Sequence, residues 1–361
     1  MVSRETSAPA FADALQSPFV AKLVGAMPEP AVIVGADGRP VAANKPAFTL
    51  LPAIKIGEPF VLALRTPDVI DALRRVMASG EAETVLWSER VPIERLFEVC
   101  VAPLAADPGE VVGTLLTLRD LTESRRVERM RADFIAYASH ELRTPLASML
   151  GFVETLQGSA RDDPGARDKF LAIMREQGRR MARLIDDLLS LSRIEEKQHV
   201  RPAAAVDLTQ TARHVADTMA PLAREMGVEI KLDAERPVVV TGDRDELLRV
   251  AENLIENAIK YGARQDGTGD DRVEVTVSRT AAEGSLIVRD FGHGIAAEHL
   301  PRLTERFYRV DAGQSRAKNG TGLGLAIVKH ILARHRGRLT IASRLEHGST
   351  FTAIVPLHDR Q

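Results

Sequence analysis

The sequence predicts an α+β multidomain protein with three folded parts. Short strand-like runs occupy residues 19–120, two long heptad-patterned helices occupy 121–200, and helices alternate with strands over 206–361. A period of two indicates half-buried strands, and a spacing of three and four indicates helices that pack along one face. The order is therefore a small α/β domain, an antiparallel helical hairpin and an α/β sandwich. We expect residues 1–18 to form a flexible leader, because they contain no continuous apolar segment.

The first domain combines short strands with tight turns. A strand at 31–34, the turn Asp37-Gly38 and a strand at 41–43 precede a short helix opened by Asn44. Three more strands are predicted at 83–87, 96–101 and 111–118. This arrangement resembles a PAS domain, a small antiparallel sheet flanked by helices that acts as a sensor or dimerisation module. Both a ligand sensor and a plain structural module remain open.

Two amphipathic helices joined by a turn rich in glycine and proline predict the hairpin. The core-facing stripes comprise Ile135, Ala138, Leu142, Leu146, Met149, Val153 and Leu156, then Phe170, Ile173, Gln177, Met181, Leu184, Leu188 and Leu191. One hairpin cannot bury a full stripe on each helix. We therefore expect a homodimer in which two hairpins form a four-helix bundle.

The motif HELRTP at residues 140–145 lies in the first of these helices. At roughly 100° per residue, His140 lies about 160° from the apolar seam marked by Leu142, so it should face solvent. Pro145 has no N–H to donate to the carbonyl of Glu141, and the helix should loosen or bend there. A lone surface histidine is usually only solvated, but an exposed imidazole beside a carboxylate also suits a nucleophile.

A helix capped by Asp243 carries polar side chains along one face. Asn253, Asn257 and the neighbours Lys260 and Tyr261 recur at the spacing of successive turns. Amide oxygens suit Mg²⁺, and a lysine suits phosphate. Taken alone, this pattern is also that of an ordinary amphipathic helix.

Three glycine-containing segments follow this helix. In the first, Asp290 with Gly292 and Gly294 comes after a strand, where a carboxylate can accept from an exocyclic amine and the backbone can approach a ligand. The second contains Gly320, Gly322, Leu323 and Gly324. It enters a helix, so its N–H groups could cradle phosphate. The third, residues 348–351, starts the last strand. A turn, a lone glycine trio or a bulge would explain each segment separately.

Taken in order after His140, these motifs resemble the H, N, G1, F, G2 and G3 boxes of two-component sensor histidine kinases. The resemblance covers residues from about 123 to 361. The segments LTERFYRVD at 303–311 and LAIVKH at 325–330 look most similar to the phosphate-regulon sensor kinases. The sequence has no GxxxxGK[ST] loop, which argues against a P-loop ATPase.

The resemblance implies an ATP-dependent protein-histidine kinase that uses ATP with Mg²⁺. His140 would become phosphohistidine and pass the phosphoryl group to an aspartate of a response regulator. The chain would also dephosphorylate that regulator. Glu141 would polarise the imidazole, and Asn257 would ligate Mg²⁺. The other implied positions are Asn253, Lys260 and Arg309 near the phosphates, Tyr261 and Asp290 at the adenosine, and residues 311–319 as a mobile lid.

Thr144 lies one helical turn beyond His140. Its hydroxyl could orient a water toward a regulator's aspartyl phosphate. Alternatively, Thr144 is structural, because a β-branched residue tolerates the restricted backbone before Pro145.

Composition limits the partners. With 48 basic and 50 acidic side chains and a net charge of −2, nothing indicates electrostatic binding of nucleic acid or anionic membrane. Cys100 is the sole cysteine, so no intramolecular disulfide can form. No apolar run approaches the ~20 residues that span a bilayer. We expect a cytoplasmic protein, or the cytoplasmic part of an inner-membrane signalling complex, with a response regulator and a second copy of itself as partners.

Three alternatives remain at this level. An ATP-driven conformational clamp of the chaperone or mismatch-repair type shares similar Asn, Asp and Gly motifs, but lacks a helix-borne HExxTP unit. A non-catalytic scaffold could bind a response regulator without phosphorylating it. A kinase of the same family could answer a stimulus other than phosphate.

Overall fold

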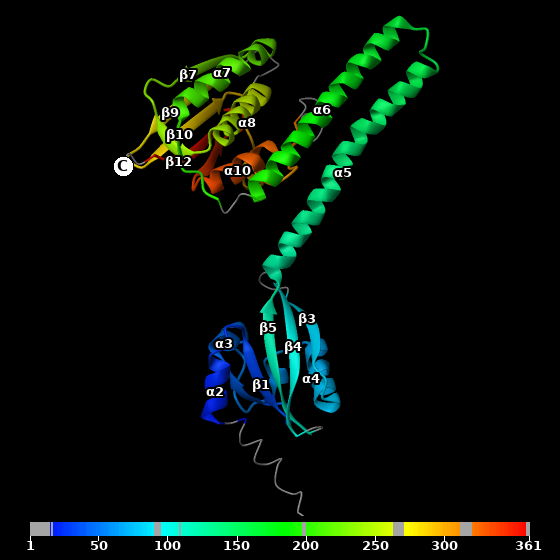
Figure 1. The fold of residues 1–361 in the computed structure, drawn as a ribbon, viewed down its shortest axis with the longest axis vertical. Helices are drawn as coiled ribbons and strands as arrows, with labels where there is room; N and C mark the ends of the chain where they lie inside the picture. The colour runs from blue at the N-terminus through cyan, green and yellow to red at the C-terminus, as the bar shows by residue number, and fades with distance from the viewer. Residues whose placement is uncertain are drawn as a thin grey trace, which may run out of the picture. The chain divides into compact units, whose positions relative to one another are not determined.

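The protein is described by a computed structural model, which covers residues 15, 17–89, 95–107, 110–196, 200–262, 271–310 and 320–358. The chain divides into two compact units, Met1–Asp133 and Phe134–Gln361. Figure 1 shows the fold of each unit. The predicted lid at 311–319 lies outside the described residues.

A five-stranded antiparallel sheet forms the centre of the first unit, with the order β2-β1-β5-β4-β3 (Figure 1). Its strands are β1 (Ala31–Gly35), β2 (Pro40–Ala43), β3 (Glu83–Glu89), β4 (Arg95–Asp107) and β5 (Glu110–Asp120). The helical elements are α2 (Pro18–Gly25), α3 (Lys45–Leu50), the 3₁₀ turn η1 (Phe60–Leu62) and α4 (Pro67–Ser79). The five predicted strands and the helix after Asn44 are confirmed. Helices α2 and α4 were not predicted.

Asn44 joins three segments of the first unit from a buried position. Its side-chain oxygen accepts from the N–H of Ala47, which caps α3, and from the N–H of Ala31 on β1. Its amide nitrogen donates to the carbonyls of Met27 and Glu29. These four bonds satisfy the buried amide, so the residue predicted as a helix cap also anchors the first strand.

Two long helices form the hairpin. They are α5 (Thr122–Gln157), which contains the boundary between the two units, and α6 (Pro164–Glu196). Phe152 and Phe170 stack between them with ring centroids 5.0 Å apart. Helix α5 continues through Pro145, and the hydroxyl of Thr144 donates to the carbonyl of His140 at 3.2 Å. His140 is exposed, as predicted.

The C-terminal part of the second unit is an α/β sandwich. Its sheet has the order β11-β12-β10-β9-β7, in which β7 pairs with β9 in parallel and the other pairs are antiparallel. The strands are β7 (Glu229–Asp233), β9 (Arg272–Arg279), β10 (Glu283–Asp290), β11 (Arg338–Ser343) and β12 (Ser349–Pro356). Helices α7 (Leu208–Glu225), α8 (Arg244–Gly262) and α10 (Gly324–Arg334) share one buried core with the sheet. The predicted α+β class is confirmed.

Two smaller features complete this part. The short strands β6 (Ala204–Asp207) and β8 (Val239–Gly242) pair in a separate sheet, which was not predicted. The carboxylate of Asp243 caps α8 by accepting from the N–H groups of Asp245 and Glu246. Among the described helices, none has the length and apolar character needed to cross a membrane.

Candidate functional site

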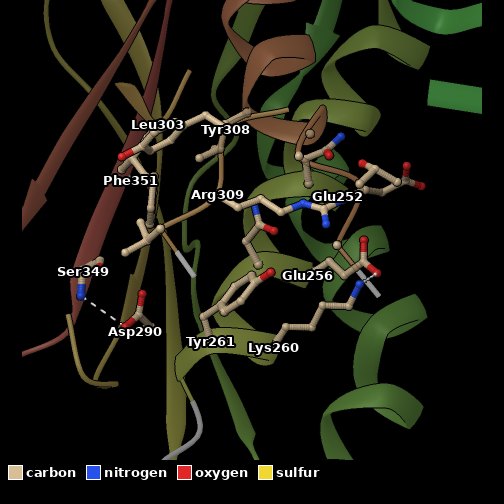
Figure 2. Close-up of a pocket in the computed structure, with 18 of the residues that line it drawn as sticks. Glu252, Glu256, Lys260, Tyr261, Asp290, Leu303, Tyr308, Arg309, Ser349 and Phe351 are labelled. Atoms are coloured by element: carbon tan, nitrogen blue, oxygen red, sulfur yellow. Dashed lines mark hydrogen bonds and ion pairs between the residues drawn. The ribbon is translucent and has the colours of Figure 1, made fainter. Parts of the chain in front are cut away.

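A cavity of about 450 Å³ opens where α8, the end of β10, the start of α10 and helix α6 meet. Figure 2 shows the side chains that line it. Helix α6 reaches this cavity because Leu184, Leu191 and Ile194 are buried in the core of the sandwich. The cavity therefore combines segments that are far apart in the sequence.

One wall of the cavity is the polar face of α8. Asn253, Asn257, Lys260 and Tyr261 all line it, as the helical spacing predicted. The ammonium of Lys260 pairs with the carboxylate of Glu256 at 2.6 Å (Figure 2). The face offers amide oxygens, a cation and an aromatic ring to one ligand.

Asp290 lines the cavity at the end of β10, next to the C-terminal end of α8, and its side chain is buried. The N–H groups of Gly292 and Ser349 both donate to its Oδ1, at 3.0 and 3.2 Å. Burial raises the pKa of the Asp290 carboxyl, although these two bonds oppose the rise. Because both bonds end at Oδ1, Oδ2 remains as an acceptor for a ligand amine.

The glycines around the cavity allow backbone segments to approach closely. A Cβ on Gly294, whose φ is +69°, would lie 2.0 Å from the carbonyl oxygen of Arg344. A Cβ on Gly322, whose φ is +74°, would lie 2.9 Å from the Cα of Phe307. A Cβ on Gly324 would lie 2.4 Å from the side-chain oxygen of Asn253. Any side chain at these positions would displace the cavity wall.

Arg309 lines the cavity and also contacts the histidine-bearing helix. Its guanidinium donates to the carboxylate of Glu141 at 3.3 Å, and Arg180 of α6 donates to the same oxygen at 2.9 Å. Glu141, the neighbour of His140, therefore pairs with two arginines in this arrangement. Because both bonds end at Oε2, Oε1 remains able to accept from the N–H of an imidazole.

Helix α6 supplies cavity residues that the sequence did not indicate: Arg183, Asp186 and Asp187. Asp187 pairs with Arg249 at 2.6 Å and accepts from the hydroxyl of Thr321 at 2.7 Å. Burial raises the pKa of Asp187, while Thr321 and Arg249 oppose the rise. No local motif predicts this contact, because it depends on how α6 packs against the sandwich.

The cavity brings together ten of the residues proposed from the sequence. They are Asn253, Asn257, Lys260, Tyr261, Asp290, Gly294, Arg309, Gly320, Gly322 and Gly324. Five others lie elsewhere. Gly292 lies behind Asp290 as a hydrogen-bond donor, and Leu323 is fully buried in the core. His140, Glu141 and Thr144 of α5 are not among the lining residues.

The lining residues fit a magnesium nucleotide. A buried carboxylate acceptor, a glycine loop at a helix N-terminus and cations such as Lys260 and Arg309 match the chemistry of an adenine, a phosphate chain and its charge. The described residues contain no group of three His, Cys, Asp or Glu side chains that could hold a metal. Mg²⁺ held by one amide oxygen, phosphates and water needs no such group. Asn257 is the candidate ligand.

Comparisons with known families cover most of the chain. Residues 24–126 match the PAS fold, and residues 130–197 match the His Kinase A (phospho-acceptor) domain. Residues 242–359 match the family described as histidine kinase-, DNA gyrase B- and HSP90-like ATPase. The phospho-acceptor match includes the HELRTP motif at residues 140–145. Because clamp-type ATPases lack this motif, the match argues against that alternative.

Individual relatives agree with this assignment. The phosphate regulon sensor protein PhoR of Pseudomonas aeruginosa is 41% identical over 241 residues, covering 66% of this chain and 53% of its own length. The sensor protein kinase WalK of Staphylococcus saprophyticus is 31% identical over 324 residues, covering 88% of this chain and 52% of its own length. The chain thus spans about half the length of these relatives.

A solved structure shows the same fold. The histidine kinase ThkA, in complex with the response regulator protein TrrA, is 21% identical with a TM-score of 0.50. The match covers 93% of this chain and 98% of that one. With its PAS, HisKA and HATPase domains in this order, the chain belongs to the family of sensor histidine kinases.

Proposed function

We propose that this chain phosphorylates its own His140 from Mg-ATP and passes the phosphoryl group to an aspartate of a response regulator. The supporting observation is the cavity, which gathers Asn257, Lys260, Asp290 and the glycine loop from separate segments. An exposed imidazole on α5 of the same unit supplies the nucleophile. The proposed domains are the sensor 19–120, the dimerisation and phosphotransfer hairpin 121–200 and the catalytic domain 206–361. Of the predicted leader 1–18, Leu15 is buried in the core of the first unit and Pro18 begins α2, so these residues belong to the sensor.

In the proposed reaction, the unprotonated ring nitrogen of His140 forms a bond to the γ-phosphorus. The bond from that phosphorus to the bridging oxygen breaks, and ADP leaves with the electron pair. The other ring nitrogen loses its proton, and Glu141 is the candidate acceptor. Lys260 and Arg309 would neutralise phosphate charge, and Mg²⁺ at Asn257 would align the phosphates. Because His140 does not line the cavity, this step requires a rearrangement that brings His140 of the same copy or of the second copy to the γ-phosphate.

Phosphate signalling is our proposal for the stimulus, supported by the 41% identity to a phosphate regulon sensor protein. Loss of the chain should then abolish the transcriptional response to phosphate limitation in its host. A normal phosphate response together with a defect under another stress would assign the kinase to a different stimulus.

A homodimer is the proposed assembly. Large apolar side chains stay exposed on the hairpin, namely Leu146, Leu150, Leu171, Ile185 and Leu189. Leu150→Glu should weaken dimerisation about 100-fold or more. Each dimer carries the change twice, and burial of each leucine contributes roughly 1.5–3 kcal/mol. Sedimentation of the full chain measures the effect, with Ser148→Glu on another face of α5 as the control. Equal dissociation constants for both variants would contradict this interface.

Thr144 is proposed to position the water that hydrolyses a regulator's aspartyl phosphate. Its hydroxyl donates to the carbonyl of His140, which leaves its oxygen able to accept from water. Thr144→Ala should keep autophosphorylation and phosphotransfer, while dephosphorylation of the regulator slows about 100-fold. Thr144→Ser should restore it. If kinase and phosphatase rates fall together in Thr144→Ala, the residue is structural.

A further inference from the structure

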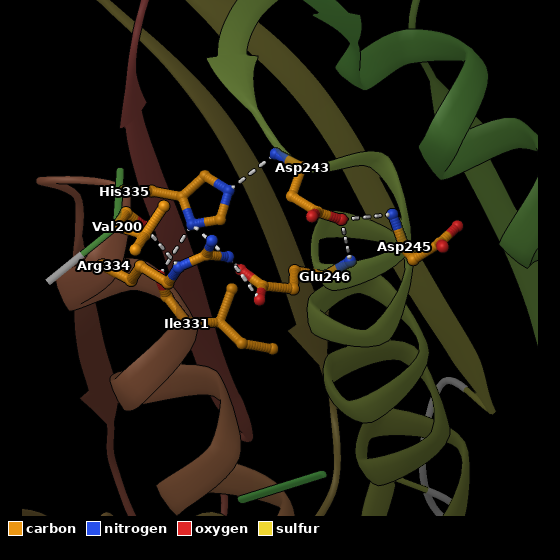
Figure 3. A network of polar contacts seen from close by, with 7 residues as sticks. All are labelled: Val200, Asp243, Asp245, Glu246, Ile331, Arg334 and His335. Carbon is orange, nitrogen blue, oxygen red and sulfur yellow. Dashed lines mark hydrogen bonds and ion pairs between the residues drawn. The ribbon is translucent and has the colours of Figure 1, made fainter. Parts of the chain in front are cut away.

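A buried histidine outside the cavity joins α8 to α10 (Figure 3). His335 follows α10, and its imidazole is enclosed by protein. Its Nε2 lies 2.9 Å from the backbone nitrogen of Asp243, and its Nδ1 lies 2.8 Å from the carbonyl oxygen of Ile331. A backbone N–H only donates and a carbonyl only accepts, so Nε2 must be the acceptor and Nδ1 must carry the proton. Only the neutral ring satisfies both contacts.

Arg334 extends the same network to a third segment. Its Nη1 donates to Glu246 in the first turn of α8 at 2.5 Å, and its Nε donates to the carbonyl of Val200 at 2.8 Å. Val200 precedes β6, between the hairpin and the sandwich. Three separate segments therefore meet at the residues Val200, Asp243, Glu246, Arg334 and His335, which we call the α8–α10 bridge (Figure 3).

The α8–α10 bridge lies at the opposite end of both helices from the cavity. Helix α8 starts at the bridge and carries Asn253 and Asn257 further along, whereas α10 starts at the glycine loop and ends at the bridge. At the cavity end the helices again meet closely, since a Cβ on Gly324 would strike the side chain of Asn253. Their separation at the cavity is thus constrained from both ends.

Gly242, just before the helix cap, shows how tightly the imidazole is held. A Cβ there would lie 3.0 and 3.1 Å from Cδ2 and Nε2 of His335, and 2.6 Å from Leu247. The ring therefore contacts the backbone that leads into α8 and hydrogen-bonds its cap residue.

We propose that His335 is a positioning residue for nucleotide binding, which in its neutral form holds α8 and α10 at the spacing that the cavity requires. This proposal rests on the proposed kinase function. His335 does not touch the nucleotide. Through Asp243 and α8 it positions Asn253 and Asn257, and through α10 it positions the glycine loop.

Protonation of His335 should disrupt the α8–α10 bridge, because a proton on Nε2 would face the N–H of Asp243. Burial lowers the pKa of His335, and the charge of Arg334 acts in the same direction. Three contacts raise the pKa of His335 instead: the hydrogen bond to the carbonyl of Ile331, and the carboxylates of Glu246 and Asp243. The carboxylate of Glu246 lies 3.7 Å from Nδ1. The bridge is therefore intact at neutral pH. It is lost as pH falls below the ordinary histidine range toward the lowered pKa.

Two substitutions separate the contacts. In His335→Gln, a side-chain oxygen can take the place of Nε2 and accept from Asp243. In His335→Asn, the shorter amide can reach only the Ile331 carbonyl. For the full chain at pH 7.5, we expect His335→Asn to raise the KM for ATP about tenfold, the effect of losing one hydrogen bond. The rate at saturating ATP should change less than about twofold, because ground state and transition state lose binding equally. His335→Gln should stay near the wild-type KM.

The pH profile supplies a second readout. As pH is lowered from 7.5 through the pKa of His335, followed by NMR of its ring in the full chain, the wild-type KM for ATP should rise more than that of His335→Gln, whose amide does not titrate. Protonation of ATP itself affects both proteins equally and cancels in the comparison. If His335 only stabilised the fold, its substitution would lower the melting temperature, but the KM for ATP would depend on pH in the same way in the wild type and in His335→Gln.

The outcomes are distinct. If the wild-type chain binds ATP but forms no phosphohistidine, the proposed function fails. The positioning role of His335 is then tested by the Kd for Mg-ADP, measured in the same variants in place of KM. If the wild type is active and His335→Asn has an unchanged KM, the positioning role is wrong. Equal KM increases in the Asn and Gln variants, or identical KM profiles for wild type and His335→Gln through the pKa of His335, would also overturn it.

Discussion

Replacing His140 with alanine should abolish autophosphorylation, with a loss of at least about 1,000-fold that reaches the detection limit. The nucleophile is removed, and neither water nor the side chains beside it offer an imidazole that could form phosphohistidine in its place. Incubation of the full chain with radiolabelled ATP and Mg²⁺, followed by measurement of acid-labile phosphate, tests this result.

Nucleotide binding provides the control for His140→Ala. Because His140 is exposed and does not line the cavity, the Kd for Mg-ADP should stay within about twofold of the wild type. Acid-labile phosphate at the wild-type level would identify a different acceptor. Loss of both phosphorylation and nucleotide binding would show a folding defect, and His140→Gln would then be used instead.

The second large effect is expected at Asn257. Asn257→Ala should slow phosphorylation of His140 about 100-fold or more, since Mg²⁺ loses a protein ligand and the phosphates lose their alignment. Titration with Mg²⁺ at saturating ATP measures the change. Unlike His140→Ala, this variant should also require a higher Mg²⁺ concentration for nucleotide binding.

An aspartate at the same position is the matched comparison. Asn257→Asp retains an oxygen ligand for the metal, so its activity should lie between the wild type and Asn257→Ala and should improve with added Mg²⁺. If Asn257→Ala keeps the wild-type rate and Mg²⁺ dependence, another residue holds the metal. If Asn257 only packed against α10, both Asn257→Ala and Asn257→Asp would show the wild-type dependence on Mg²⁺.

Local sequence signals identified most of the elements that carry the proposed site. The predicted alternation of helices and strands over 206–361 is present, and Asp243 caps α8 as expected. Side-chain periodicity and helix caps operate within a few neighbouring residues, so they can be read along the chain. The face of Asn253, Asn257 and Lys260 follows from the same helical spacing.

Short or weakly patterned elements were missed. Strands β6 and β8 have four residues each, too few for a period of two to be distinguished, and no tight turn joins them as Asp37-Gly38 joins β1 to β2. They are stabilised by pairing with each other across more than 30 residues. Helix α2 has eight residues and packs against the first sheet. Helix α4 was missed despite local signals, because Pro67 opens it, Gly80 ends it, and Val69, Leu73 and Val76 recur at helical spacing.

The sequence by itself therefore determined the order of domains, the exposed position of His140 and the amide-bearing face of α8, because local spacing encodes them. Only the tertiary structure decided that Asp187 of α6 reaches the glycine loop, that Arg309 pairs with Glu141, and that His335 joins α8 to α10. Such contacts arise when whole helices and sheets pack to bury apolar surface, which brings together side chains that share no local pattern.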